Sequence, residues 1–382
     1  MSAIASSAQK IIPPGRIDLA IGQPSPRLLP FDVMARAAAH AGADPERLPL
    51  SYGTEQGDGR FREALARFLS PRYGVPVDPA ELLVTNGASQ AIDLVCTLFA
   101  RRGDAIFVEE PTYFLARKIF ADHGLEPVAL PMDGEGLVVE AVAEALATRK
   151  PAFLYTIPTY HNPTSRCLSA ERRRRLARLS REWGLLVVAD EVYHPLVYEE
   201  TPPPPPLASF CREAEILSIG SFSKILAPGL RLGWLQADPR HIGRITACGL
   251  LDSGGGLNPY TSGIVRSALE LGLVEEHLAF LKETYRRRML ALCDALRAEL
   301  PPEVSFRQPG GGFFLWLEFP ERIDTEALLP RALERDLEFM PGPRFSSRGA
   351  LHNNMRLSFA YFEIPDLKEG ARRLAQIVRS AL

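Results

Sequence analysis

Between residues 80 and 240 the chain alternates short apolar runs with amphipathic stretches. This alternation is typical of strand–helix units, in which each apolar run becomes a strand of a parallel sheet that helices cover on both faces. The runs predict strands over residues 82–85, 105–108, 152–157, 185–189, 216–219 and 232–236. Helical spacing predicts helices over residues 88–100, 112–123 and 169–183. The chain is therefore predicted to be an α/β protein with a doubly wound, mostly parallel central sheet.

The segments on either side of this block have a different pattern. A long helix is expected near residues 274–300, and strands are expected over 313–318 and 355–359. The length of 382 residues accommodates one large and one smaller domain. We expect residues 50–262 to form the large α/β domain. Residues 1–49 together with 263–382 are expected to form a smaller α+β domain, with an N-terminal segment that covers the site.

Composition and missing motifs exclude several classes of function. The 44 Lys and Arg residues nearly balance the 46 Asp and Glu residues, and the formal charge of -2 provides no field that would attract nucleic acid or an anionic membrane. The chain lacks the signatures of nicotinamide dehydrogenases, P-loop nucleotide hydrolases, zinc proteases and serine hydrolases. Its 5 cysteines form no C-x-x-C pair, so we expect neither a disulfide framework nor a metal site.

Neither the N-terminus nor any other segment has the signature of export or membrane insertion. The first residues lack the charged and apolar parts of a secretory signal, and no apolar run reaches the roughly 18 residues of a membrane span. We therefore expect a cytoplasmic protein without a membrane partner. The proline run at 202–206 is interpreted as a stiff surface loop.

Polar clusters follow five of the predicted strands at the point where each strand ends. In an open parallel sheet the ligand crevice lies just beyond these carboxyl ends, so that separate segments converge on one place. The clusters are residues 86–90, 110–113, 161–164, 190–193 and 221–224. We therefore expect one ligand site rather than several.

Lys224 is the first candidate for chemistry, because it ends a Ser-Phe-Ser-Lys turn after a predicted strand. The hydroxyls of Ser221 and Ser223 and the guanidinium of Arg231 are suited to holding a phosphate. A crowded cationic site lowers the pKa of an amine and makes it a nucleophile that can form a Schiff base. The alternative is an ordinary lysine that faces solvent.

Other clusters provide further candidates. Asp190 follows a predicted apolar strand, where a buried carboxylate needs a cationic partner such as a pyridinium nitrogen. The alternative is an aspartate that caps a turn at the end of the strand. The turn before Ala88 and Ser89 opens a helix whose free N–H groups can hold an anion, or it is a plain N-cap without a ligand. Tyr113 either stacks on an aromatic ring or is a packing tyrosine.

An ordered set of short motifs runs through the chain. Its members are Asn162-Pro163-Thr164, Asp190-x-x-Tyr193, Ser221-x-Ser223-Lys224, Gly229-Leu230-Arg231 and Arg356-Leu357-Ser358-Phe359. From about residue 20 to the C-terminus, this set resembles the class I/II aminotransferases among the fold type I pyridoxal phosphate-dependent enzymes, the aspartate aminotransferase-like superfamily. Within it, the chain looks most similar to the 2-aminoadipate and aromatic amino acid aminotransferases. One departure is Ser165, which stands where the family often has glycine.

The resemblance implies that pyridoxal 5'-phosphate is the cofactor. Lys224 would form the Schiff base with its aldehyde and move a proton at the substrate α-carbon. Asp190 would keep the ring nitrogen protonated, Tyr113 would stack on the ring, and Asn162 and Tyr193 would bond to the phenolic oxygen. The implied phosphate ligands are Ala88, Ser89, Ser221, Ser223 and Arg231, with Tyr52 reaching in from the second subunit of a homodimer.

For the substrate, the resemblance implies that Arg356 holds the α-carboxylate in a two-pronged clamp, with Asn162 and Gln23 beside it. Side-chain specificity is expected from residues 23–29 and from residues 258–260 of a second subunit. Arg27 is either a switch for acidic side chains or a solvated arginine.

The predicted activity is transfer of an amino group from an α-amino acid to a 2-oxo acid by a ping-pong mechanism, with 2-oxoglutarate as the expected acceptor. Because the cofactor supplies the reactivity and the site selects the bond that breaks, other reactions stay open. The alternatives are a lyase, a decarboxylase or an oxidase acting on an amino acid, and a catalytically silent domain that senses a ligand.

Overall fold

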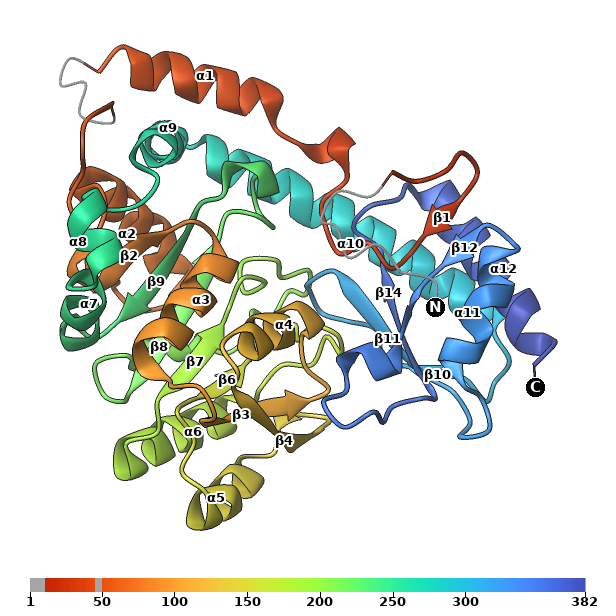
Figure 1. The fold of residues 1–382 in the computed structure, drawn as a ribbon. Coiled ribbons are helices and arrows are strands. Elements are labelled where there is room, and N and C mark those ends of the chain that lie inside the picture. The colour runs from red at the N-terminus through yellow and green to blue at the C-terminus, as the bar shows by residue number, and fades with distance from the viewer. Residues whose placement is uncertain (1–10, 45–49, 382) are drawn as a thin grey trace.

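The computed structural model describes residues 11–44 and 50–381. Its largest sheet has eight strands in the order β2-β9-β8-β7-β6-β3-β4-β5 (Figure 1). The strands are β2 (Leu82–Thr85), β3 (Ala105–Glu110), β4 (Glu126–Asp133), β5 (Gly136–Leu137), β6 (Leu154–Thr156), β7 (Val187–Asp190), β8 (Ile216–Ser221) and β9 (Gly233–Ala237). Five neighbouring strands are parallel, whereas β9 is antiparallel to both β2 and β8. The predicted α/β class with a mostly parallel sheet is confirmed.

All the strands predicted for this sheet are present, and their ends shift by no more than two residues. The prediction nevertheless lacks β4, which runs parallel to β3 near one edge of the sheet. Leu130 is the one buried residue of β4, and prolines at 127 and 131 break its apolar pattern. A half-exposed strand near an edge has no continuous apolar run, so the pattern that revealed the other strands could not reveal this one.

Alternate residues of the strands face two separate apolar cores. On one face, Val188 and Ile219 share a core with Phe120 of α4. On the other face, Val187 belongs to a different core with Leu176 of α6. The covering helices are α3 (Ala88–Phe99), α4 (Phe114–Asp122), α5 (Val139–Thr148) and α6 (Ala170–Trp183). Helices therefore cover both faces, which is the doubly wound arrangement that the sequence predicted.

A smaller α+β part is built from both ends of the chain. Its antiparallel sheet has the order β10-β11-β14-β13, and β1 pairs in parallel with β12. The strands are β1 (Ile17–Asp18), β10 (Ser305–Phe306), β11 (Phe314–Glu318), β12 (Leu337–Glu338), β13 (Met340–Pro341) and β14 (Asn354–Ser358). The helices of this part are α10 (Leu273–Glu299), α11 (Thr325–Leu333) and α12 (Ile364–Arg379) (Figure 1). Helix α12 packs against both α10 and α11 and contacts β1 and β12.

Five further helices lie in the rest of the described chain. They are α1 (Phe31–Gly42), α2 (Gly59–Tyr73), α7 (Pro239–Thr246), α8 (Gly249–Gly254) and α9 (Pro259–Glu270). Helix α9 packs against α1 and α2 and leads into α10. The domain boundary predicted after residue 262 falls inside α9, and the boundary after residue 49 borders a stretch outside the described residues. Both boundaries stay predictions.

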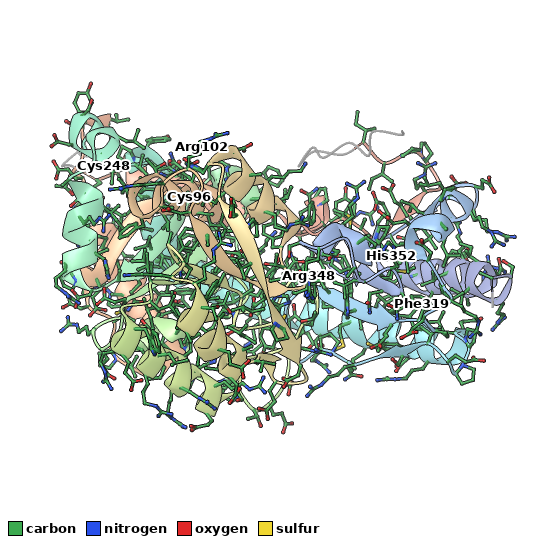
Figure 2. The ribbon with its side chains drawn as sticks, turned by 60° about the horizontal axis from the view of Figure 1, so that its bottom comes forward. Cys96, Arg102, Cys248, Phe319, Arg348 and His352 are labelled. Carbon is green, nitrogen blue, oxygen red and sulfur yellow. The ribbon has the colours of Figure 1, made fainter. Side chains whose placement is uncertain are left out.

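The side chains in Figure 2 show how the two parts meet. Cys96 and Cys248 lie in the part that carries the large sheet, whereas Phe319 and His352 lie in the smaller part. Arg348 lies between them, and its neighbour Ser347 donates a backbone hydrogen bond of 2.9 Å to Glu110 of β3. All five cysteines are free thiols. Within residues 11–44 and 50–381, no helix has the length and hydropathy to cross a bilayer.

The proline segment at 202–206 forms neither helix nor strand. Its C-terminal end is fixed by the buried Glu191, whose carboxylate accepts backbone hydrogen bonds from Leu207 at 2.8 Å and from Ala208 at 3.1 Å. The side chain of Arg173 also donates to the carbonyl of Pro205 at 3.2 Å. The end of the loop is thus held by Glu191, which follows β7, and by Arg173 of α6.

Gly220 provides a test of the packing between β8 and β9. It pairs with Trp234, and a Cβ at residue 220 would lie 2.1 Å from the indole ring. We expect Gly220→Ala to lower the free energy of unfolding by about 1–3 kcal/mol, because the buried ring must move. Denaturant unfolding measures this change.

Gly249→Ala is the matched control, because no atom lies within 4 Å of the added Cβ. Its free energy of unfolding should stay within about 0.5 kcal/mol of the parent. Equal stability of the two variants would contradict the packing described here.

Candidate active site

The parallel strands β2, β3, β6, β7 and β8 end at one edge of the large sheet, as the sequence predicted for their polar clusters. Because β9 is antiparallel, it starts at this same edge. Arg231, two residues before β9, therefore joins the clusters that follow the other strands. The ligand crevice of an open α/β sheet lies at such an edge.

Lys224 lies inside this site rather than in solvent. Its Nζ donates a 2.9 Å hydrogen bond to the carbonyl of Gly22 and lies 5.6 Å from the ring centre of Phe313. Burial lowers the pKa of Lys224 to about 8; the charges of Arg356 and Arg231 lower it as well, and Asp190 opposes them. The reading of Lys224 as an ordinary solvent-facing lysine is thereby excluded.

Asp190 is buried at the end of β7. Its Oδ2 accepts a 2.7 Å hydrogen bond from the Tyr155 hydroxyl. Its Oδ1 is also buried and has no hydrogen-bond partner in the described part of the chain. Burial raises the pKa of Asp190 to about 6, against the lowering effects of the Tyr155 bond, of a hydrogen bond from the backbone of Val192 and of the Lys224 charge. An unpartnered, buried carboxylate oxygen requires a donor, and a protonated ring nitrogen is one.

Arg356 and Asn162 form a second cluster. Arg356 comes from β14 of the smaller part and donates to Oδ1 of Asn162 at 2.9 Å and to the carbonyl of Ala20 at 2.6 Å. Its guanidinium stacks 4.1 Å from the ring centre of Phe314. Burial lowers the pKa of Arg356 to about 10, so the side chain stays a cation at neutral pH. Arg356 is thus a buried cation that is fixed in one plane.

The start of α3 and the turn after β8 form an anion cradle. Gly87 is the N-cap of α3 with φ +82°, and no side chain caps the first turn. Arg231 Nη2 donates to the carbonyl of Asn86 at 3.3 Å, which places the guanidinium beside the start of the helix. Ser221 Oγ and Ser223 Oγ lie 3.0 Å apart. Two hydroxyls, one guanidinium and an open helix start are the groups that hold phosphate.

Two tyrosines border the site. Tyr113 precedes α4, and its pKa is raised to about 12, mainly by burial and further by the charge of Asp190, with Arg356 opposing. Tyr193 is buried edge-on against Phe313 and Phe314, with ring centres 5.6 and 5.9 Å apart. Burial raises the pKa of Tyr193 well above its usual value. Both hydroxyls therefore stay protonated and can donate hydrogen bonds.

Other predicted residues lie differently. The side chain of Tyr52 is 85% exposed. Gln23 makes no hydrogen bond among the described residues, although Gly22 beside it contacts Lys224. Asn258, a candidate for contact with the substrate of a second subunit, donates to the carbonyl of Arg231 in its own chain at 2.6 Å, and its expected role stays a prediction.

Sequence reasoning missed three contributors to the site. Ala20 and Gly22 act through backbone carbonyls, which no residue type reveals. Tyr155 was assigned to a strand without a role, although a tyrosine near the end of a buried strand carries a hydroxyl that requires a partner. Ser165 has φ +57° and donates to the carbonyl of Phe314 at 2.6 Å. The turn that follows Asn162 thus adopts its left-handed conformation without glycine.

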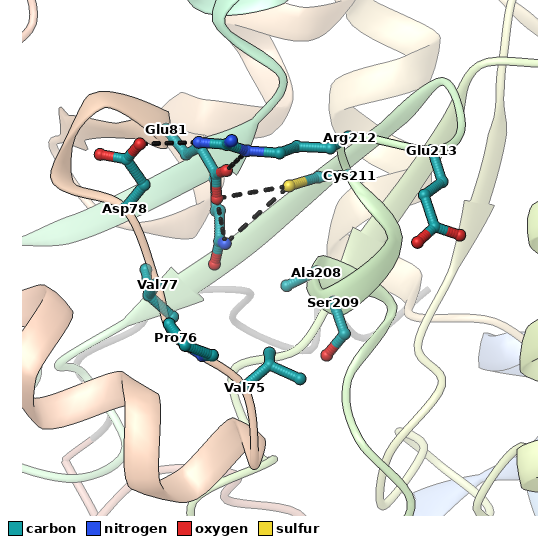
Figure 3. A pocket seen from close by; sticks show the side chains of 11 residues that line it. Val75, Pro76, Val77, Asp78, Glu81, Ala208, Ser209, Cys211, Arg212 and Glu213 are labelled. Atoms are coloured by element: carbon teal, nitrogen blue, oxygen red, sulfur yellow. Dashed lines mark hydrogen bonds and ion pairs between the residues drawn. The ribbon is translucent and has the colours of Figure 1, made fainter.

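A cavity of about 360 Å³ lies away from this site (Figure 3). Its lining includes Glu81, immediately before β2, and Gln236, near the end of the antiparallel β9. The cavity therefore lies at the amino ends of the parallel strands, opposite the site around Lys224. Glu81 accepts a 2.9 Å hydrogen bond from Gln236 and forms an ion pair with Arg212. Because these charged groups pair with one another, the cavity lacks the reactive set found at the other edge.

The chain matches known proteins over most of its length. The sequence model of the family described as "Aminotransferase class I and II" matches residues 14–374. The aromatic-amino-acid aminotransferase 1 of Thermococcus litoralis is 33% identical over 372 residues, which cover 96% of this chain and 88% of the relative. The 2-aminoadipate transaminase of Thermus thermophilus is 34% identical over 376 residues, which cover 97% and 91%.

A solved structure shows the same fold. The α-aminoadipate aminotransferase of Thermus thermophilus, complexed with N-(5'-phosphopyridoxyl)-L-leucine, superposes with a TM-score of 0.87 at 32% identity. The match covers 99% of this chain and 96% of that one.

Gly87 tests the anion cradle. A Cβ at residue 87 would lie 3.1 Å from Arg231 Nη2. We expect Gly87→Ala to weaken binding of pyridoxal 5'-phosphate roughly tenfold or more, because the methyl group displaces the guanidinium from the start of α3. A spectrophotometric titration of the protein with the cofactor measures the affinity.

Gly74→Ala is the control, since Gly74 also has a positive φ, of +70°, but no atom lies within 4 Å of its added Cβ. It also places a side chain at a positive φ, although its ψ is +10° where that of Gly87 is +173°, and it should leave the affinity unchanged. Equal losses in both variants would show that strain, and not the cradle, is responsible.

Proposed function

The chain belongs to the aminotransferase class I and II family, and from this premise we propose that the site around Lys224 is its active site. The protein is a pyridoxal phosphate-dependent aminotransferase, which moves the amino group of an α-amino acid to a 2-oxo acid. We further propose 2-oxoglutarate as the acceptor and a ping-pong order of two half-reactions. The observation that carries the proposed site is the buried Oδ1 of Asp190, which lacks a partner in the described chain and shares the site with Lys224 and Arg356.

The residues of the site fit pyridoxal phosphate group by group. Asp190 Oδ1 fits a protonated ring nitrogen, because each satisfies the other's charge. The open start of α3 at Ala88 and Ser89 fits the phosphate, together with the hydroxyls of Ser221 and Ser223 and with Arg231. Tyr113 provides an aromatic face for the ring.

When bound, pyridoxal phosphate supplies an aldehyde that exchanges its oxygen for an amino nitrogen, and a ring that accepts the electron pair of the substrate α-carbon. We propose that Lys224 bonds to this aldehyde and later moves a proton at the α-carbon. Its pKa of about 8 leaves part of the amine neutral near neutral pH, and a neutral Nζ is both a nucleophile and a base. Tyr193 and Asn162 are proposed to hold the phenolic oxygen.

Arg356 is proposed to bind the α-carboxylate of the substrate. A guanidinium can offer two parallel N–H donors to a carboxylate, which a lysine cannot. Asn162 and the carbonyl of Ala20 hold the plane of Arg356, and its buried Nε has no partner in the described chain. Gln23 is proposed to lie beside the substrate. Relatives named for aromatic amino acids and for 2-aminoadipate support a donor with a long or aromatic side chain.

We also propose a homodimer in which Tyr52 of one subunit binds the phosphate in the other. Tyr52 is 85% exposed, and large apolar side chains at Phe31, Leu50 and Tyr260 are also exposed. Exposed apolar groups of this kind are typical of an interface between subunits. The cytoplasm is the proposed compartment, supported by five free thiols, which reducing compartments maintain.

A single half-reaction tests the proposed function. The cofactor-loaded protein, mixed with an α-amino acid but no oxo acid, should lose absorbance at about 430 nm and gain absorbance at about 330 nm. One equivalent of the matching 2-oxo acid should be released, and 2-oxoglutarate should then restore the first spectrum. A panel of amino acids run in this way ranks the donors.

Lys224→Ala is the control for this reaction and should release no oxo acid under the same conditions. Release of a product other than the matching oxo acid would favour a lyase or a decarboxylase. Continued release of the oxo acid together with ammonia, with consumption of oxygen, would favour an oxidase. A spectral change without any product would favour a sensing domain.

Mixed dimers test the shared site. Lys224→Ala and Tyr52→Ala are each expected to be strongly impaired, one in the proton transfer and one in phosphate binding. Unfolding and refolding the two together should restore activity, because one site of each mixed dimer then contains both Lys224 and the partner's Tyr52. A mixture no more active than its two components, with mixed dimers demonstrated by mass spectrometry, would rule out sharing.

A further inference from the structure

Within the described part of the chain, the side chain of Tyr155 forms its hydrogen bond with Asp190. Its hydroxyl donates to Asp190 Oδ2 at 2.7 Å, and the residue is fully buried. We propose that Tyr155 is a positioning residue, which holds the Asp190 carboxylate so that Oδ1 faces the ring nitrogen of the cofactor. This inference rests on the proposed role of Asp190.

The sheet places the two side chains together. Tyr155 of β6 pairs with Val188 of β7, and Asp190 follows two residues later on the same strand. Because side chains two residues apart on a strand point to the same face, Asp190 and Val188 share the face on which Tyr155 lies. The ring of Tyr155 is held edge-on against Phe120 with ring centres 5.3 Å apart. The hydroxyl therefore has one fixed direction, toward Asp190.

The hydrogen bond from Tyr155 gives the two oxygens of the Asp190 carboxylate different roles. A carboxylate rotates easily about its last torsion, which is broad and roughly two-fold. The Tyr155 hydroxyl occupies Oδ2 and blocks this rotation, while Oδ1 receives no hydrogen bond from the described residues. Without the Tyr155 hydroxyl the carboxylate of Asp190 can rotate, and Oδ2 becomes a second buried oxygen without a donor.

The bond also keeps Asp190 ionised. Burial raises its pKa to about 6, whereas the bond from Tyr155 lowers it, followed by a hydrogen bond from the backbone of Val192 and the charge of Lys224. Glu191, its neighbour on the chain, raises it. The charge of Asp190 in turn contributes to the raised pKa of Tyr113. Without the Tyr155 hydroxyl the carboxyl group takes up a proton at higher pH, and a neutral carboxyl group no longer favours a protonated ring nitrogen.

Two cofactors that differ at one atom test the proposal. Pyridoxal 5'-phosphate and its analogue with C–H in place of the ring nitrogen share the aldehyde and the phosphate, so only the nitrogen senses Asp190. The parent protein should bind the natural cofactor more tightly than the analogue. In Tyr155→Phe this preference should fall roughly tenfold or more, while affinity for the analogue stays unchanged.

The pH dependence of the preference provides a second readout. The preference exists while Asp190 is ionised, and it is lost as the pH falls through the pKa of Asp190. Removal of the hydroxyl raises that pKa, so Tyr155→Phe should lose the preference at a higher pH than the parent does. A role confined to packing would not move this midpoint.

Tyr285→Phe is the matched control. Tyr285 is equally buried, but its hydroxyl has no partner in the described chain. This variant should keep the full preference for the natural cofactor. In the Asp190→Asn background, Tyr155→Phe should have no further effect on the preference, because the group it positions is no longer a carboxylate.

Each other outcome is informative. An unchanged preference in Tyr155→Phe, or an equal loss of affinity for both cofactors, would overturn the positioning role and leave the proposed function intact. A parent protein that binds both cofactors equally would remove the proposed role of Asp190 and this inference with it. Thermal unfolding of each variant shows whether the fold is retained.

Discussion

The burial of one carboxylate determines how the rest of the site is built. An ionised carboxylate in an apolar environment is costly unless it is paired, and burial raises the pKa of Asp190 to about 6. The Tyr155 hydroxyl satisfies one oxygen, and the charge of Lys224 supports the ionised form. The second oxygen receives no donor from the described residues. Oδ1 of Asp190 therefore requires a cationic hydrogen-bond donor, and a pyridinium nitrogen is such a donor.

Three distant segments of the chain have to meet before the site exists. Arg356 comes from the smaller sheet, Asn162 from the loop between β6 and α6, and Ala20 from the N-terminal segment, and hydrogen bonds of 2.9 and 2.6 Å join them. The same N-terminal segment provides the carbonyl of Gly22 that accepts from Lys224. Arg356 and Lys224, the proposed carboxylate clamp and the proposed reactive amine, are therefore held by one short stretch of backbone, so a shift of that stretch changes both.

The sequence was informative wherever side-chain chemistry follows from topology. Asp190, Lys224 and Asn162 could be grouped because parallel strands bring their carboxyl ends to one edge. Strand β4 could not be found, because a half-exposed edge position leaves no apolar run. The carbonyls of Ala20 and Gly22 could not be found either, since every residue has one. The role proposed for Tyr52 depends on a second copy of the chain, and nothing local at an exposed tyrosine indicates it.

One electrostatic environment gives two cations different tasks. Burial lowers the pKa of both Lys224 and Arg356, to about 8 and about 10. Because arginine starts from a higher value, the same penalty leaves it charged at neutral pH while it brings the lysine close to losing its proton. The repulsion between the two acts in the same direction, since each positive charge favours the neutral form of the other and the lysine yields first. A neutral nucleophile can thus exist beside a permanent carboxylate clamp. With arginine at residue 224 and lysine at residue 356, the permanent positive charge would stand at the place where the proposed mechanism needs a neutral amine.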